Sequence, residues 1–153
     1  PLIGNAVVAI ILGLAFIFSG AAFGQIETMI IPSCLAFGLT FLREFVKDMA
    51  DIEGDSKAGL NTFPAKVGLE KSAKFAIVSA LIIGAGALFP YLNGYYDIPY
   101  LVVLFLGVEI PLLMIVFSFL KSPEIDQAKR FSEVLKFSTI AGLMAFFVDN
   151  YVR

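Results

Sequence analysis

Hydrophobic residues in this chain are gathered into five long stretches, such as "AIILGLAFIFSGAAFG", and polar residues into the segments between them. A helix that crosses a membrane requires about 20 predominantly apolar residues. The alternation over about ten residues that marks the strands of a membrane barrel is missing. The pattern therefore predicts an all-α, polytopic transmembrane helix bundle, with spans at about residues 4–24, 28–48, 73–92, 99–120 and 134–152.

The polar segments divide the positive charge unevenly. Ten of the eleven Lys and Arg residues flank the segments after the second and fourth stretches, and the eleventh is Arg153. The segments after the first and third stretches carry only the acidic Glu27 and Asp97. Loops rich in Lys and Arg remain in the cytoplasm. We therefore expect an integral protein of the cell membrane whose charged loops, the one after Asp51 and the one from Lys121 to Glu133, are cytoplasmic.

Composition agrees with a membrane protein and narrows the possible chemistry. Hydrophobic residues make up 59% of the 153 and charged residues 16%, far from the balance of a soluble domain. The chain has no histidine and a single cysteine, Cys34, so histidine catalysis, a disulfide and a cysteine metal site are excluded for it. A general base would be a carboxylate, a lysine, a tyrosine or a bound phosphate.

Most of the candidate chemistry lies in one polar segment, residues 43–68. Four carboxylates follow one another there at intervals of four, three and four residues: Glu44, Asp48, Asp51 and Asp55. If the second span continues past the membrane surface, this spacing places them on one helical face. We expect that helix to end at Gly54, with Asp55 on the first turn of the loop.

The side chains around these carboxylates indicate which ligand they serve. Aligned carboxylates repel one another unless a cation lies between them, and an oxygen-only ligand set suits Mg²⁺ or Ca²⁺. Arg43 and Lys47 are interleaved with the acids, which suits an anionic group bridged by the metal. The segment is therefore interpreted as a magnesium and diphosphate site at the membrane face. The simpler alternative is a solvated cap of charges that pair with one another.

The same segment resembles a known family motif. The run Arg43-Glu44-x-x-Lys47-Asp48-x-x-Asp51-x-x-Gly54-Asp55-x-x-x-Gly59-x-x-Thr62-x-Pro64, closed by Gly68, is similar to the second aspartate-rich motif of the UbiA superfamily of intramembrane prenyltransferases, and the upstream "GNAVVA" matches too. The resemblance implies nine transmembrane helices, Mg²⁺ dependence and two aspartate motifs that face each other across a cavity. The first motif, Asn-x-x-x-Asp-x-x-x-Asp, is absent. We therefore expect residues 1–153 to be the C-terminal part of one prenyltransferase domain, with the missing N-terminal half of the same enzyme as its partner.

The resemblance also implies roles for individual residues. Asp51 and Asp55, with Asp48 beside them, are expected to be catalytic as ligands of Mg²⁺. The expected contacts to the diphosphate or to the phosphate of an acceptor are Arg43, Lys47, Lys57, Lys66 and Asn5. Glu44 is left with two roles, as a proton acceptor or as a residue that orients a cation.

The form of the motif is most similar to the branch of the superfamily that makes archaeal ether lipids. This similarity implies transfer of a prenyl group, geranylgeranyl by preference, from its diphosphate to geranylgeranylglyceryl phosphate. An aromatic acceptor of the quinone, chlorophyll or tocopherol type is the alternative within the family. Expected partners are therefore a prenyl diphosphate, a lipid or aromatic acceptor and the membrane lipid, with no nucleic acid.

Two questions remain from the sequence: the role of Glu109, and whether another class of membrane protein or enzyme fits the pattern. Glu109 lies near the middle of the fourth span, two residues before Pro111, and it has either a structural role at the proline kink or a role in lining a cavity. A transporter or channel fragment would place charged residues at the midplane of several spans, and only Glu109 does so. A CDP-alcohol phosphotransferase would carry Asp-Gly-x-x-Ala-Arg, which is missing, and a soluble terpene synthase would have less apolar helices.

Overall fold

The computed structural model describes residues 2–152, and within them every regular element is a helix. Arg153 lies outside the described residues. The elements in chain order are α1 (Ile3–Ala22), α2 (Ile26–Ala50), α3 (Ile52–Lys57), α4 (Phe63–Val67), α5 (Leu69–Leu92), α6 (Ile98–Leu104), the π-helix η1 (Phe105–Glu109), α7 (Ile110–Lys121) and α8 (Ile125–Val152). Five helical segments are long and apolar enough to cross a membrane, namely α1, α2, α5, the α6–η1–α7 unit and α8. The predicted all-α membrane bundle is confirmed.

Two boundaries differ from the predictions. The stretch from Lys121 to Glu133 was expected to be a loop, but only residues 122–124 are non-helical and α8 begins at Ile125. The first turns of α8 are amphipathic, and Ala128 and Phe131 are buried against the bundle, which stabilises helix beyond the apolar stretch. The helix expected to end at Gly54 instead ends at Ala50, and Gly54 lies inside the short helix α3.

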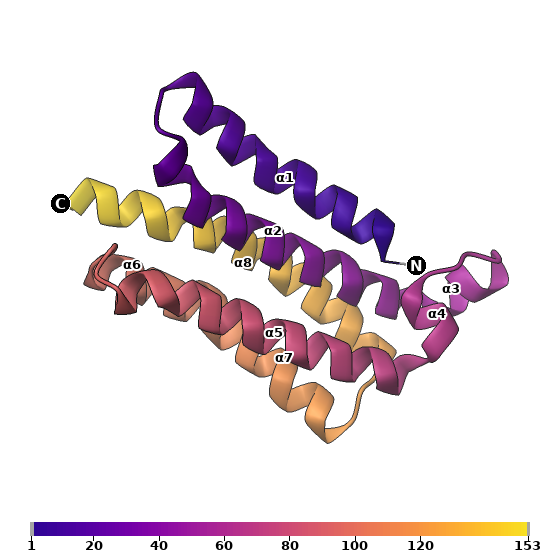
Figure 1. Cartoon of the computed structure of the whole chain (residues 1–153). Helices are drawn as coiled ribbons and strands as arrows, with labels where there is room; N and C mark the ends of the chain where they lie inside the picture. The colour runs from indigo at the N-terminus through magenta and orange to yellow at the C-terminus, as the bar shows by residue number, and fades with distance from the viewer. Residues whose placement is uncertain (1, 153) are drawn as a thin grey trace.

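Helix α2 is the central element of the bundle. It packs against α1, α5 and α8, and its inward-facing side chains, from Leu35 to Met49, form much of the buried core. Figure 1 shows the start of α1 together with α3 and α4 at one end of the bundle, and the end of α8 at the other. Many large apolar side chains on the outer faces of α1, α5, α7 and α8 are exposed, which is the surface that contact with lipid requires.

The fourth span is interrupted by the π-helix η1. Pro111 follows it and cannot donate a backbone hydrogen bond to the carbonyl four residues earlier, so a widened turn relieves the contact of the ring with that carbonyl. The part before this turn, α6, packs on α8, whereas the part after it, α7, packs on α5. Glu109, the last residue of η1, is buried, and its carboxylate lies against Gly84 of α5. This contact favours the structural role of Glu109 at the kink.

An aromatic cluster attaches α4 to the bundle. Phe63 of α4 lies between Phe45 of α2 and Phe75 of α5, with ring centroids 5.8 Å and 5.6 Å away. Gly59 and Gly68, on either side of α4, have φ values of +68° and +85°, which residues other than glycine rarely adopt. These turns and the aromatic cluster hold the segment after α2 over the end of the bundle.

The close approach of η1 to α8 gives a test of the fold. A Cβ on Gly107 would clash with the Cβ of Ala141, so Gly107→Ala should separate the helices and lower the free energy of unfolding by about 1–3 kcal/mol. Gly86→Ala on α5 is the matched control, because a Cβ there meets nothing within 4 Å. The measurement is thermal unfolding of both variants in the same detergent. Equal midpoints for the two variants would contradict this packing.

Candidate functional site

The first and second spans are joined by a hydrogen bond at the polar end of the bundle. The side-chain amide of Asn5, on the first turns of α1, donates from Nδ2 to Oδ2 of Asp48 on α2, at 2.8 Å. Asn5 is buried and Asp48 half-buried. Asn5, expected as a substrate contact, therefore also holds one of the three predicted aspartates in a fixed orientation.

Arg43 and Glu44, one turn deeper in α2, form an ion pair. Both side chains are half-buried, with 29% and 19% of their surface exposed. This ion pair is the contact that the second predicted role of Glu44, orienting a cation, requires. Lys47 on the same helix is exposed. Three charged groups act electrostatically on the Asp48 carboxylate. They are the carboxylates of Asp55 and Glu44 and the ammonium of Lys47.

The remaining predicted residues lie on the segment over the end of the bundle. Asp51 is the exposed residue between α2 and α3, and its N–H still bonds to the carbonyl of Lys47. Asp55 lies in α3, where its Oδ2 accepts a hydrogen bond of 2.9 Å from Thr62. Lys57 ends α3 and Lys66 lies in α4, both exposed. The predicted residues thus gather at one end of the bundle.

The carboxylate oxygens at this end of the bundle are of the kind that binds magnesium, but there are too few of them to hold the ion alone. Among residues 2–152, no three acidic or other metal-binding side chains lie close enough together to hold an ion by themselves. Mg²⁺ is commonly held by one or two carboxylates, with water and substrate phosphate oxygens completing an octahedron. Asp48 and Asp55 are oxygen donors of this kind, and each has one oxygen in a hydrogen bond that fixes its direction. The residues present fit a partial magnesium site.

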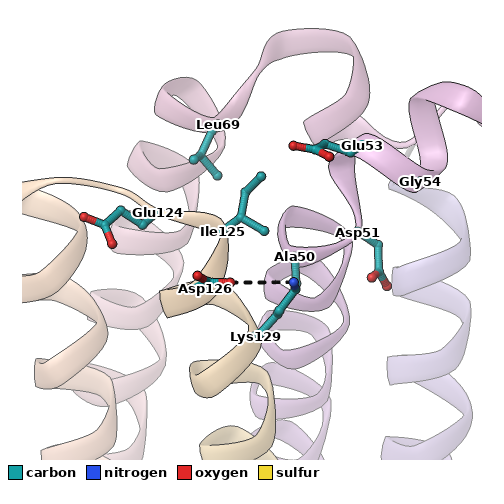
Figure 2. Close-up of a pocket in the computed structure, with 9 residues that line it drawn as sticks. All are labelled: Ala50, Asp51, Glu53, Gly54, Leu69, Glu124, Ile125, Asp126 and Lys129. Atoms are coloured by element: carbon teal, nitrogen blue, oxygen red, sulfur yellow. Dashed lines mark ion pairs between the residues drawn. The ribbon is translucent and has the colours of Figure 1, made fainter.

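A separate cavity of about 730 Å³ opens at the same end, between the α2–α3 junction and the start of α8 (Figure 2). Its charged lining consists of Asp51, Glu53, Glu124, Asp126 and Lys129. Lys129 is 3.6 Å from Asp126, and Figure 2 shows Asp51 turned away from that ion pair. This lining has four carboxylates and a single ammonium, and it lacks Lys47, Lys57 and Lys66, the cations expected to contact a diphosphate. The junction between Asn5 of α1 and Asp48 of α2 is the better site.

Two polar residues near the predicted site were not predicted to take part in it. Thr62 belongs to the motif, but its spacing of seven residues from Asp55 gives no sign of a hydrogen bond across a turn. Lys136 of α8 lines a groove with Arg43, although in the sequence it is only one of the cations that indicate topology. Nothing in its own sequence neighbourhood indicates this contact, because it depends on how α8 packs against α2.

Five apolar spans with oxygen donors and cations at one end define an integral membrane protein with a polar cluster at one end of its helix bundle. Residues 1–140 match the UbiA prenyltransferase family. The chain belongs to this family.

Individual relatives agree with that assignment. The chain is 35% identical over 153 residues to a digeranylgeranylglyceryl phosphate synthase of Methanococcus vannielii, covering 99% of this chain and 54% of the relative. It is 37% identical over 150 residues to the synthase of the same name from Methanopyrus kandleri, covering 95% of this chain and 53% of that relative. The chain thus spans about half the length of the curated relatives it matches.

A solved structure of digeranylgeranylglyceryl phosphate synthase in membranes is similar in fold. It superposes with a TM-score of 0.82 at 29% identity, over 96% of this chain and 52% of that one. The bundle described above therefore has the helix arrangement of one half of that structure.

The hydrogen bond from Asn5 to Asp48 predicts the effect of two substitutions. Asn5→Ala leaves a half-buried carboxylate without its donor and should lower the free energy of unfolding by about 1–3 kcal/mol. Asn5→Asp should lower it further at neutral pH, because two carboxylates then face each other. Thermal midpoints in detergent measure both effects, with Asn61→Ala, at an exposed position, as the control. An Asn5→Asp protein as stable as the wild type would show that the two side chains do not meet.

Proposed function

We propose that the chain supplies the second aspartate motif of an intramembrane, Mg²⁺-dependent prenyltransferase. The observation that carries this proposal is the meeting of Asn5 and Asp48 at the polar end of an apolar bundle, beneath a segment that bears Asp55, Lys57 and Lys66. Membership of the UbiA prenyltransferase family supports the reaction type. The curated names of the relatives support a geranylgeranyl group as the donor chain and geranylgeranylglyceryl phosphate as the acceptor.

The reaction breaks the allylic C–O bond of the prenyl diphosphate, and the bonding electron pair leaves with the diphosphate. A hydroxyl oxygen of the acceptor bonds to the same carbon, and its proton passes to an oxygen of the departing diphosphate. Mg²⁺, when bound, neutralises charge on the departing diphosphate. Lys47, Lys57 and Lys66 are proposed to contact the same phosphates, and positioned cations of this kind are most effective where water is excluded.

The proposed orientation places the polar end in the cytoplasm. The loops that carry Lys57, Lys66 and Lys121 lie at this end, which the positive-inside rule assigns to the cytoplasmic face. Phosphorylated substrates would then reach Asp48 and Asp55 from the cytoplasm, with their prenyl chains between the helices. The other half of the central cavity is proposed to come from the N-terminal half of the same enzyme.

The two motif aspartates after α2 give the direct test of this proposal. In the complete gene product, Asp51→Ala and Asp55→Ala should abolish Mg²⁺-dependent prenyl transfer, with a loss of at least about a hundredfold, while the protein remains folded. Glu53→Ala, an exposed carboxylate between them, should leave turnover unchanged. Transfer is measured with radiolabelled geranylgeranyl diphosphate across a titration of Mg²⁺. Near wild-type turnover of either aspartate variant would contradict the metal assignment.

The acceptor class is tested with the unmodified protein. Membranes that contain the complete gene product are given geranylgeranyl diphosphate together with geranylgeranylglyceryl phosphate or with aromatic quinone precursors. We expect alkylation of the glyceryl phosphate and none of the aromatic compounds, detected by mass spectrometry of the lipid extract. Alkylation of an aromatic compound alone would assign the chain to another branch of the family.

A further inference from the structure

A groove runs along one face of α2, between α1 and α8. Both neighbours pack on α2, which forms the floor of the groove. The groove has a volume of about 440 Å³. Its walls are apolar for most of their length, with Val8, Ile11 and Leu12 on α1 and Ile140 on α8. A hydrocarbon chain is the ligand that such walls suit.

Two cations from different helices line the same groove. They are Arg43 of α2 and Lys136 of α8, and Glu44, the partner of Arg43, is the one acidic side chain in the lining. Lys136 is exposed and forms no ion pair with any residue from 2 to 152. With two cations and one carboxylate, the lining of the groove has a net charge of one positive unit.

Arg43 retains donors that the protein does not use. Its terminal nitrogen bonds to Glu44, but its Nε–H is buried and has no acceptor within the part of the chain that the structure describes. A guanidinium has five N–H donors, and a buried donor without a partner costs free energy. The Arg43 side chain is 29% exposed, so an anion in the groove would accept hydrogen bonds from its accessible N–H groups.

The groove also lies next to the proposed diphosphate site. Arg43 and Glu44 precede Lys47 and Asp48 by four residues, so they are one turn, or about 6 Å, deeper along α2. A ligand held at Arg43 therefore lies directly beside a diphosphate held near Asp48.

We propose that Arg43 and Lys136 bind the phosphate of the acceptor lipid and that the groove between α1 and α8 holds its hydrocarbon chain. The inference rests on the proposed function and deepens it, because it names the residues that select a phosphorylated lipid over an uncharged acceptor. Arg43 binds through its forked guanidinium and Lys136 as a point charge from the opposite wall. Charge and shape both match a monophosphate attached to a single prenyl chain.

The first experiment measures binding without catalysis. The complete gene product in nanodiscs of uncharged phosphatidylcholine is titrated with geranylgeranylglyceryl phosphate and with its dephosphorylated alcohol, in the absence of Mg²⁺ and prenyl diphosphate. We expect the wild type to bind the phosphate at least about tenfold more tightly, and Lys136→Gln to lose most of this preference. Lys129→Gln, the same substitution on the same helix outside the groove, should retain it. Arg43→Lys should retain part of it, because the charge remains and the fork is lost.

Three results would overturn the inference. Equal binding of the phosphate and the alcohol by the wild type would show a groove for ordinary lipid or for another helix. Competition by tailless glycerol phosphate as strong as by the full lipid would show a site for a soluble anion. An unchanged preference in Lys136→Gln would remove Lys136 from the site.

The second experiment separates this inference from the proposed function. In the transfer reaction, Lys136→Gln should raise the KM for the acceptor about tenfold and change the KM for the prenyl diphosphate less than about twofold. An equal rise of both constants would contradict a site for the acceptor alone. A wild type with the binding preference but no prenyl transfer would refute the proposed function, whereas transfer without the preference would refute only this inference.

Discussion

The hydrocarbon interior of a membrane offers no hydrogen-bond partner to a polar group, and every other feature of this chain depends on that constraint. Backbone groups must bond within each span, so the chain forms long helices and nothing else where it crosses. The charged side chains are excluded to the ends of the helices, where α3, α4 and the first turns of α8 extend the bundle beyond its apolar part. A lipid substrate with a phosphate group is divided in the same way. Its charge belongs at the end of the bundle and its chain between the helices.

The membrane spans were predictable because that constraint requires each span to be a long run of apolar residues, which the sequence shows directly. Each predicted span corresponds to one of the five apolar helical segments. The ends differ by a few residues, and the π-helix inside the fourth span was not predicted, since hydropathy measures only where apolar residues stop. The start of α8 is the clearest case, because Ala128 and Phe131 are held by packing that no single-segment pattern reveals. The break after Ala50 has a similar origin. Phe63 must reach Phe45 and Phe75, which requires the chain to turn earlier than Gly54.

The residues of the candidate site gather at one end of the bundle, and their contacts with one another were only partly predicted. The spacing of Glu44 and Asp48 places them one turn apart on α2, because local periodicity determines which residues of one helix lie together. Contacts between helices depend on rotation and tilt, and the sequence does not state these. The hydrogen bond of Asn5 to Asp48 and the position of Lys136 opposite Arg43 are contacts of that kind. The hydrogen bond from Thr62 to Asp55 was also not predictable, because it depends on how the chain turns between them.

The widened turn at η1 has a consequence for how one span can have two neighbours. A π-turn holds one residue more than an α-turn, and one residue corresponds to a rotation of about 100° around the helix axis. The side chains of α7 are therefore out of phase with those of α6, and the stripe that faces α8 in the first part gives way to one that faces α5 in the second. This change of phase lets a single span pack mainly on α8 in its first part and mainly on α5 in its second.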